Sequence, residues 1–354
     1  MLNVSGADRR TSIICTLGPI SETRACIEAL IAAGMDVVRL SMSNGSRERH
    51  RSTVRLARKA AADQGRQVRF LADLQGRKNR LGRLLDGRAE WRPDEEVLLT
   101  LEPGSLASHR TWTTYPWNAD LVGEGAEVLI DDGAVTLRVK ETSQEQLRCV
   151  VVEGGAVTDG RGVTMPGTAM PSGLTERDAE DLQWVRELDV DMVALSFAAS
   201  TNDYDEIRAL TDIPLIIGKV ESATAVARLP ELAQAFDGLM VARGDLGLEV
   251  PFEDVPFVQR DVLDECARRG KLSIVATQVL LSMRTNLRPT RAEVADVVTA
   301  VLDGAGGLML TGESGYGRHP VHVVEVLRRI VQRAERAALS APGVAAERPV
   351  PTGT

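Results

Sequence analysis

The stretch GLMVARGDLGLEV (238–250) decides how this chain folds, together with PLIIGKVES (214–222) upstream. Each begins as an apolar run of strand length, and each ends abruptly in charged residues. Runs that are apolar without alternation are typical of strands buried on both faces, as in parallel sheets. The charged residues that end the two runs are Lys219 and Glu221, then Arg243 and Asp245.

Apolar runs of this kind recur along the chain, and helical patterns lie between most of them. TERD (175–178) fits a helix-capping box, and Ser21 is the expected cap of a helix that stops at Gly34. Eight strands alternating with helices predict an α/β fold, the (β/α)₈ or TIM barrel. The runs are TSIICTLG (11–18), DVVRLS (36–41), VRFLADL (68–74), DMVALSF (191–197), PLIIGKV (214–220), GLMVARG (238–244), KLSIVAT (271–277) and GLMLTGE (307–313).

The third and fourth runs are too far apart for one crossover helix. Residues 81–166 show short β-like runs punctuated by Gly, Pro and Asp, which predict a small all-β domain inserted after strand three. The barrel domain is then 1–80 and 167–338, close to the roughly 250 residues typical of this fold. Residues 339–354 are expected to be a disordered tail. The β-like runs are EVLLTL (96–101), AEVLIDDG (126–133), VTLRVK (135–140) and LRCVVVEGG (147–155).

Polar residues fall near the C-terminal ends of the predicted barrel strands, the face where active sites of this fold lie. Glu221 and Asp245 beside Lys219 predict a divalent-metal site next to a fixed cation, which suits chemistry on a phosphorylated or enolic anion. Ser196 and Glu313 could instead form structural contacts at the rim. The full set is Arg39, Ser41, Asp73, Ser196, Lys219, Glu221, Arg243, Asp245, Thr277, Thr311 and Glu313.

Composition excludes several other classes. The formal net charge of −8 argues against a nucleic-acid partner, and the arginines at 47–58 are interpreted as a solvated helix face. The four cysteines form no CxxC pair, which favours reduced thiols over disulfides or zinc. No apolar run reaches the roughly 18 residues of a membrane span, and the N-terminus lacks a signal-peptide pattern. A cytoplasmic protein without a membrane partner is expected.

The motifs resemble those of the pyruvate kinase family over nearly all of 10–338. The resemblance implies a barrel with a domain inserted after strand three. It also implies phosphoryl transfer from phosphoenolpyruvate to ADP through a Mg²⁺-bound enolate. The matching segments are CTLGP (15–19), VVRLSMSNG (37–45), LADLQG (71–76), IDDG (130–133), IIGKVES (216–222), MVARGDLGLEVP (240–251), ATQVLLSM (276–283), RPTRAEVADV (288–297) and LTGES (310–314).

The resemblance also implies catalytic and metal-binding roles for individual residues. Glu221 and Asp245 match the two carboxylates that hold Mg²⁺ or Mn²⁺. Lys219 matches the lysine that stabilises the phosphoryl group in flight, and Arg39 contacts the same group. Thr277 matches the threonine on the proton path to the enolate carbon.

Substrate and nucleotide contacts follow in the same way. The turn Ala242, Arg243 and Gly244 matches backbone amides that receive the phosphoenolpyruvate carboxylate, for which a helix N-terminus is well suited. Arg80 and Arg161 match cationic contacts to the phosphates of ADP or ATP. Arg161 stands where lysine is usual, which keeps the charge but changes the geometry.

Some positions match the site of a monovalent cation. Where many members carry Asn, Thr-Lys and Glu around K⁺, this chain has Ser41, Leu74-Gln75 and Lys78. This combination resembles the K⁺-independent branch, in which the Lys78 ammonium replaces the cation, so no K⁺ requirement is expected. An ordinary surface lysine is the alternative. Ser41, Asp73 and Lys78 are also expected among the substrate-binding residues.

Other positions depart from the family pattern, mostly on the nucleotide side. GRKNR (76–80) has Arg77 in place of proline and Asn79 in place of an apolar residue. Ser43 and Asn44 stand in the nucleotide-contacting motif, where Asn44 replaces a histidine. SFAAS (196–200) lacks an arginine.

Three hypotheses remain open at this point. The first is a minimal pyruvate kinase. The second is a repurposed enzyme that uses the enolate site with another acceptor, or for lyase or decarboxylase chemistry. The third is a non-catalytic regulatory relative, which is disfavoured because clustered buried charges are costly without a function.

The sequence as given stops after the last predicted barrel helix. The resemblance implies a further C-terminal domain, which binds allosteric effectors in typical members. Allosteric control of that kind is therefore not expected. A homodimer through barrel faces is compatible with the pattern.

Overall fold

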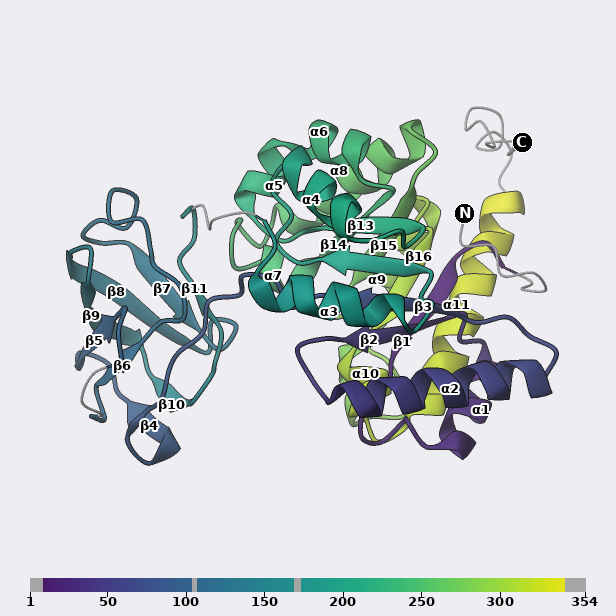
Figure 1. The fold of residues 1–354 in the computed structure, drawn as a ribbon, viewed down its shortest axis with the longest axis horizontal. Coiled ribbons are helices and arrows are strands. Elements are labelled where there is room, and N and C mark those ends of the chain that lie inside the picture. Colours follow the sequence, from purple (N-terminus) through teal and green to yellow (C-terminus); the bar gives the residue numbers. More distant parts are fainter. Residues whose placement is uncertain (1–8, 104–106, 169–172, 341–354) are drawn as a thin grey trace.

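The computed structural model describes residues 9–103, 107–168 and 173–340. Eight parallel strands close into a barrel in which the first strand also pairs with the last, Ser12 opposite Gly307 (Figure 1). The predicted α/β barrel is therefore confirmed. In order around the barrel the strands are β1 (Ser12–Thr16), β2 (Val37–Ser41), β3 (Arg69–Asp73), β12 (Met192–Leu195), β13 (Leu215–Val220), β14 (Gly238–Ala242), β15 (Leu272–Ala276) and β16 (Gly307–Leu310).

Helices surround the barrel and cover the outer faces of its strands. Of the helices in the described ranges, none is both long and apolar enough to cross a bilayer. The helices are α1 (Arg24–Ala33), α2 (Arg47–Asp63), α3 (Glu176–Arg186), α4 (Thr201–Leu210), α5 (Ala223–Ala227), α6 (Leu229–Ala235), α7 (Arg243–Leu246), α8 (Val255–Arg268), α9 (Arg291–Leu302), α10 (Gly312–Gly315) and α11 (Pro320–Ser340), with 3₁₀ turns η1 (Leu85–Gly87) and η2 (Leu281–Arg284).

Two of the predicted helix boundaries can be compared with the structure. Thr175 and Asp178 form the predicted capping box at the start of α3. The prediction for α1 was wrong at its start, because Thr23 caps this helix and Ser21 instead closes a turn with Gly18. The predicted stop at Gly34 is confirmed, and its φ of 122° suits glycine.

The barrel interior is filled by apolar side chains that alternate along each strand. On β13, Leu215 and Ile217 belong to the interior cluster, and Lys219 and Glu221 continue the same alternation toward the C-terminal end. The alternation that fills the interior therefore also delivers polar groups to the barrel mouth. The cluster is Ile14, Val37, Leu71, Met192, Ala194, Ile217, Met240, Leu272, Ile274, Ala276 and Met309.

A separate β domain lies between β3 and α3 and stands beside the barrel (Figure 1). Its six-stranded sheet has the order β11-β7-β8-β9-β5-β6, and a two-stranded sheet pairs β10 with β4. The expected small β domain is thus present, whereas its boundaries at 81 and 166 stay a prediction. We call it the lid. Its strands are β4 (Arg88–Trp91), β5 (Glu96–Thr100), β6 (Arg110–Trp112), β7 (Glu127–Ile130), β8 (Val135–Thr142), β9 (Gln146–Glu153), β10 (Gly155–Thr158) and β11 (Val163–Thr164).

The end of the barrel domain differs slightly from the prediction. Helix α11 continues through Ser340, whose hydroxyl donates to the Arg336 carbonyl at 2.9 Å. Residues 339–340 are therefore helical and not part of a tail. The rest of the predicted tail, 341–354, lies outside the described residues.

Gly76, which follows β3, allows a close approach between two strand ends. Its φ is +63°, and an added Cβ would lie 2.6 Å from Ser196 Cβ. Gly65 is a matched control, because its φ is +62° and nothing lies within 4 Å of the position that a Cβ would take there. Gly65→Ala should lower the free energy of unfolding by about 1 kcal/mol from backbone strain alone. Gly76→Ala should lower it by about 3 kcal/mol or more, because crowding is added.

Denaturant unfolding of both variants measures this difference. Equal losses for Gly76→Ala and Gly65→Ala would show that the contact with Ser196 is not tight in solution.

Candidate active site

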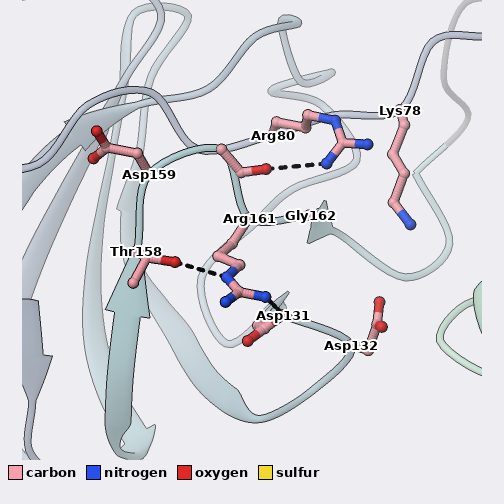
Figure 2. A pocket seen from close by; sticks show the side chains of 9 residues that line it. Lys78, Arg80, Asp131, Asp132, Thr158, Asp159, Arg161 and Gly162 are labelled. Atoms are coloured by element: carbon pink, nitrogen blue, oxygen red, sulfur yellow. Dashed lines mark hydrogen bonds and ion pairs between the residues drawn. The ribbon is translucent and has the colours of Figure 1, made fainter. Parts of the chain in front are cut away.

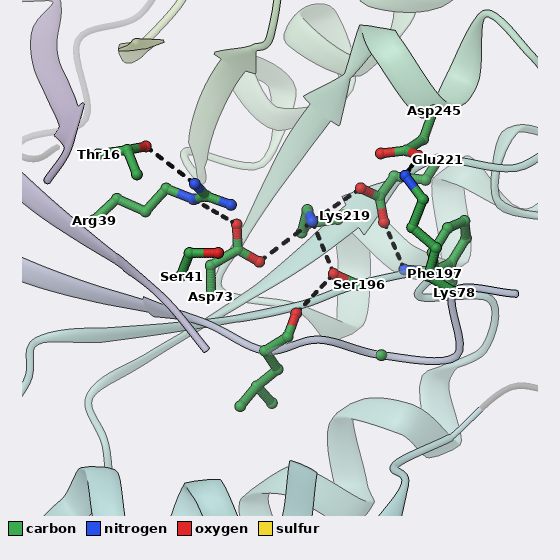
Figure 3. A network of polar contacts seen from close by, with 12 residues as sticks. Thr16, Arg39, Ser41, Asp73, Lys78, Ser196, Phe197, Lys219, Glu221 and Asp245 are labelled. Atoms are coloured by element: carbon green, nitrogen blue, oxygen red, sulfur yellow. Dashed lines mark hydrogen bonds and ion pairs between the residues drawn. The ribbon is translucent and has the colours of Figure 1, made fainter. Parts of the chain in front are cut away.

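The mouth of the barrel holds a buried ammonium group. Lys219 Nζ donates to Ser196 Oγ at 2.8 Å, and it lies 2.9 Å from Glu221 Oε1 and 3.2 Å from Asp73 Oδ1 (Figure 3). Burial alone would lower the pKa of Lys219, but attraction to Asp73 and then Glu221 outweighs it and raises that pKa. Lys219 is therefore a permanently charged cation held by three strand ends.

Arg39 adds a second cation from β2. Its Nε lies 2.7 Å from Asp73 Oδ2, and its Nη1 donates to Thr16 Oγ1 at 3.0 Å. Burial works to raise the pKa of Asp73, yet Lys219 and Arg39 together hold it below its usual value. Asp73 thus stays ionised and bridges the two cations (Figure 3).

Glu221 and Asp245 form the carboxylate side of the site. Glu221 is almost fully buried, and its Oε2 accepts from the Phe197 amide at 2.8 Å. Burial, with a further contribution from Asp245, raises the pKa of Glu221 against the opposing effect of Lys219. Phe197 has a φ of 56°, a strained conformation for a non-glycine residue that is found preferentially at functional sites.

The fit of this pair to a metal ion can be judged from its chemistry. Carboxylate oxygens are the ligands that Mg²⁺ prefers, and it usually takes only one or two from the protein. Within the described ranges, no group of three or more His, Cys, Asp and Glu side chains could hold a metal. Glu221 and Asp245 therefore fit a divalent ion that draws its remaining ligands from water and substrate.

Thr277 and the start of α7 meet beside these carboxylates. The Gly244 amide donates to Thr277 Oγ1 at 2.8 Å, and Thr277 has a φ of 66°. The Arg243 guanidinium donates to the Thr277 carbonyl at 2.9 Å and pairs with Asp296 at 2.7 Å. The predicted turn Ala242–Gly244 therefore meets Thr277 through the Gly244 amide and the Arg243 side chain.

The predicted nucleotide contacts fall into two places. Arg80 and Arg161 line an open hollow of about 390 Å³ in the lid, together with Lys78 (Figure 2). Arg80 donates to the Gly160 carbonyl at 3.0 Å, and Arg161 pairs with Asp131 at 3.0 Å.

The other two predicted nucleotide contacts, Ser43 and Asn44, lie on the barrel beside the predicted substrate contact Ser41. Ser41 and Asn44 line a cavity of about 80 Å³ that also includes Arg39. Asn44 Nδ2 donates to Ser41 Oγ at 3.3 Å. Ser43 lies between them on the loop after β2. The structure therefore brings Ser41, Ser43 and Asn44 together, but apart from Arg80 and Arg161.

Lys78 does not contact Ser41 or Asp73 in the structure. Its Nζ instead lies 2.6 Å from Asp245 Oδ1 (Figure 3). The ammonium thus stands on a predicted metal ligand rather than on the predicted monovalent-cation site.

Sequence reasoning left some residues of the site unassigned. Ser196 was identified at a strand end but given no role; it accepts from Lys219 and donates to the Leu74 carbonyl at 2.8 Å. Thr16 contacts Arg39, and Asp296 pairs with Arg243; both lie in matching segments but were given no role. Glu313 is structural, as its carboxylate accepts from the amides of Leu280 and Thr311.

This geometry defines an α/β-barrel protein with a lysine–carboxylate centre at the mouth and cations in an inserted lid. A family model described as "Pyruvate kinase, barrel domain" matches residues 8–324. The chain therefore belongs to the pyruvate kinase family.

Individual relatives agree with the family match. Pyruvate kinase from Mycobacterium tuberculosis is 42% identical over 340 residues, which cover 94% of this chain and 72% of that protein. Pyruvate kinase from Corynebacterium glutamicum is 43% identical over 335 residues, which cover 93% of this chain and 70% of that protein. Pyruvate kinase from Geobacillus stearothermophilus is 37% identical over 337 residues, which cover 93% of this chain and 57% of that protein.

The buried carboxyl group of Glu249, close to the site, predicts how the stability of the folded protein depends on pH. Burial raises the pKa of Glu249 from 4.5 to about 7, although a hydrogen bond from the Gly167 amide opposes this shift. Ionised Glu249 thus destabilises the folded state above pH 7, and the penalty disappears as the pH falls toward 4.5. Glu249→Gln should gain about 1–2 kcal/mol of stability relative to wild type between pH 5 and pH 8.

Thermal unfolding at the two pH values measures this gain, with Glu253→Gln as the exposed control. A difference between Glu249→Gln and wild type that does not change with pH would contradict the raised pKa.

Proposed function

We propose that this chain is a pyruvate kinase that transfers the phosphoryl group of phosphoenolpyruvate to ADP and gives pyruvate and ATP. The observation that carries this proposal is Lys219, held by Ser196, Asp73 and Glu221 at the barrel mouth. A fixed buried cation neutralises charge on a transferring phosphoryl group, and phosphoryl transfer depends mainly on such positioning.

Glu221 and Asp245 would hold Mg²⁺ or Mn²⁺ at the edge of this centre. Such an ion, when bound, neutralises charge on the enolate and phosphoryl oxygens. The chain's own residues supply the rest. Lys219 and Arg39 face the phosphoryl group, and the backbone of Ala242–Gly244 binds the substrate carboxylate. When the phosphoryl group leaves the enol oxygen for ADP, the enolate carbon takes up a proton along a path that includes Thr277.

The nucleotide would be bound from two sides. Arg80 and Arg161 in the lid hollow contact its phosphates, and Ser43 and Asn44 contact it from the barrel. Arg80, Arg161 and Lys78 bring three cations to a hollow of about 390 Å³, which Asp131, Asp132 and Asp159 also line.

We further infer that activity does not require K⁺, because Lys78 stands where K⁺-dependent members carry Glu. In this structure its ammonium lies beside the site, against Asp245. A cytoplasmic location fits the small soluble substrates. A homodimer through barrel faces stays a prediction.

A coupled assay with phosphoenolpyruvate, ADP and Mg²⁺, following pyruvate, tests this function. Replacing K⁺ by tetramethylammonium at constant ionic strength, which keeps screening unchanged, should alter turnover by less than about twofold. A strong K⁺ requirement would refute the role of Lys78 as a cation substitute. Absence of turnover while Mg²⁺-dependent oxalate binding persists would favour a repurposed enzyme with another acceptor.

The role of Lys219 has its own test. Lys219→Met should reduce turnover by far more than tenfold and should leave Mg²⁺ binding largely intact. A tenfold reduction corresponds to about 1.4 kcal/mol of activation free energy. Lys140→Met removes an exposed lysine of the lid and serves as the control. A Lys219→Met variant that keeps more than about a tenth of the wild-type rate would contradict the assignment.

A further inference from the structure

The lid is joined to the barrel by two chain crossings, and both are tied to one barrel segment, Asp245–Glu249. On the outgoing crossing, Lys78 Nζ lies 2.6 Å from Asp245 Oδ1. On the returning crossing, the Gly167 amide donates to the Glu249 carboxylate. The segment that carries a predicted metal ligand is therefore also the attachment point of the lid.

The junction between lid and barrel is closely packed. Residues of both crossings and of the barrel surround a void of only about 20 Å³. Lys78 and Asp245 are 26% and 23% exposed, so their ion pair is partly shielded from water. The residues around the void are Arg77, Lys78, Asn79, Trp117, Val163, Thr164, Met165, Thr168, Phe197 and Glu249.

We propose that Lys78 and Glu249 are positioning residues that fasten the lid to the Asp245–Glu249 segment, and that the Lys78 ammonium competes with the divalent ion for Asp245. The proposal rests on the proposed function, because it takes Asp245 as a metal ligand. Binding of the ion then releases the outgoing crossing, while the contact between Glu249 and Gly167 keeps the returning crossing in place.

Electrostatics gives the reason for the competition. An ammonium and a divalent ion cannot both lie against Asp245 Oδ1 without strong repulsion between like charges. A divalent ion prefers carboxylate oxygen and would displace the monovalent group, which sits on a flexible four-carbon stem.

Displacement of Lys78 from Asp245 would also affect the predicted nucleotide contacts in the lid. Lys78 lines the lid hollow together with Arg80 and Arg161, and Arg80 pairs with Gly162 across the two crossings. A movement of Lys78 therefore changes how this hollow is held against the barrel. By linkage, the ion must then change nucleotide affinity, and the nucleotide must change ion affinity by the same factor.

Mn²⁺ binding in the absence of substrates tests the competition without turnover. Titration followed by the electron paramagnetic resonance of free Mn²⁺ should show Lys78→Met binding about fivefold more tightly than wild type, as expected for loss of a partly exposed ion pair. Lys78→Arg keeps the cation and should stay close to wild type. Lys140→Met makes the same charge change at an exposed lid position and should change nothing.

The outcomes separate this proposal from the proposed function. Equal or weaker Mn²⁺ binding by Lys78→Met overturns the competition alone. Absence of Mn²⁺ binding in wild type and variants alike overturns it together with the metal site. Lys78→Gln serves as a second neutral variant if Lys78→Met does not fold.

Deuterium exchange provides an independent readout of the two crossings. Mn²⁺ should increase exchange in the peptide around Lys78 in wild type, and should have no such effect in Lys78→Met. Glu249→Ala should increase exchange at the returning crossing, 163–168, and the exposed control Glu253→Gln should not. Unchanged exchange at 163–168 in Glu249→Ala overturns the role of Glu249.

Discussion

A buried ammonium group is the constraint on which the rest of the site depends. Removing a charge from water is costly unless opposite charges and hydrogen bonds replace the lost hydration. Asp73 and Glu221 do this for Lys219, and Asp73 in turn fixes Arg39. With the Lys78–Asp245 pair, three cations balance three carboxylates, so the cluster is neutral as it stands. A phosphorylated substrate therefore needs the charge of a divalent ion to enter with it.

The barrel makes this cluster possible because it brings distant strands to one mouth. The side chains of Ser196 and Asp73 are 123 positions apart in the sequence, but both touch Lys219 because β3 and β12 are neighbours. Gly76 allows the chain that leaves β3 to pass close to Ser196, so the path toward the lid begins beside a residue that holds Lys219. The insertion point of the lid is thus a part of the site geometry.

Much of this could be predicted from the sequence, since apolar runs and their charged ends are local signals. The barrel, the β insertion and the meeting of Lys219, Glu221 and Asp73 follow from strand order and the convergence of strand ends. The partner of Lys78 does not, because Asp245 lies 167 residues away and the contact depends on how the lid is seated. The contact of Glu249 with the lid could not be predicted either, because it also depends on how the lid is seated on the barrel.

The departures from the family pattern at the lid crossing have structural partners. Arg77, in place of proline, donates to the Leu174 carbonyl at 3.2 Å. Asn79, in place of an apolar residue, is buried, and its amide group exchanges hydrogen bonds with the backbone of Tyr115 in the lid. Buried polar groups that are satisfied in this way help to define one arrangement. Arg77 and Asn79 therefore form contacts that hold the lid in place. They need not reflect loss of nucleotide binding, which favours the family activity over a repurposed enzyme.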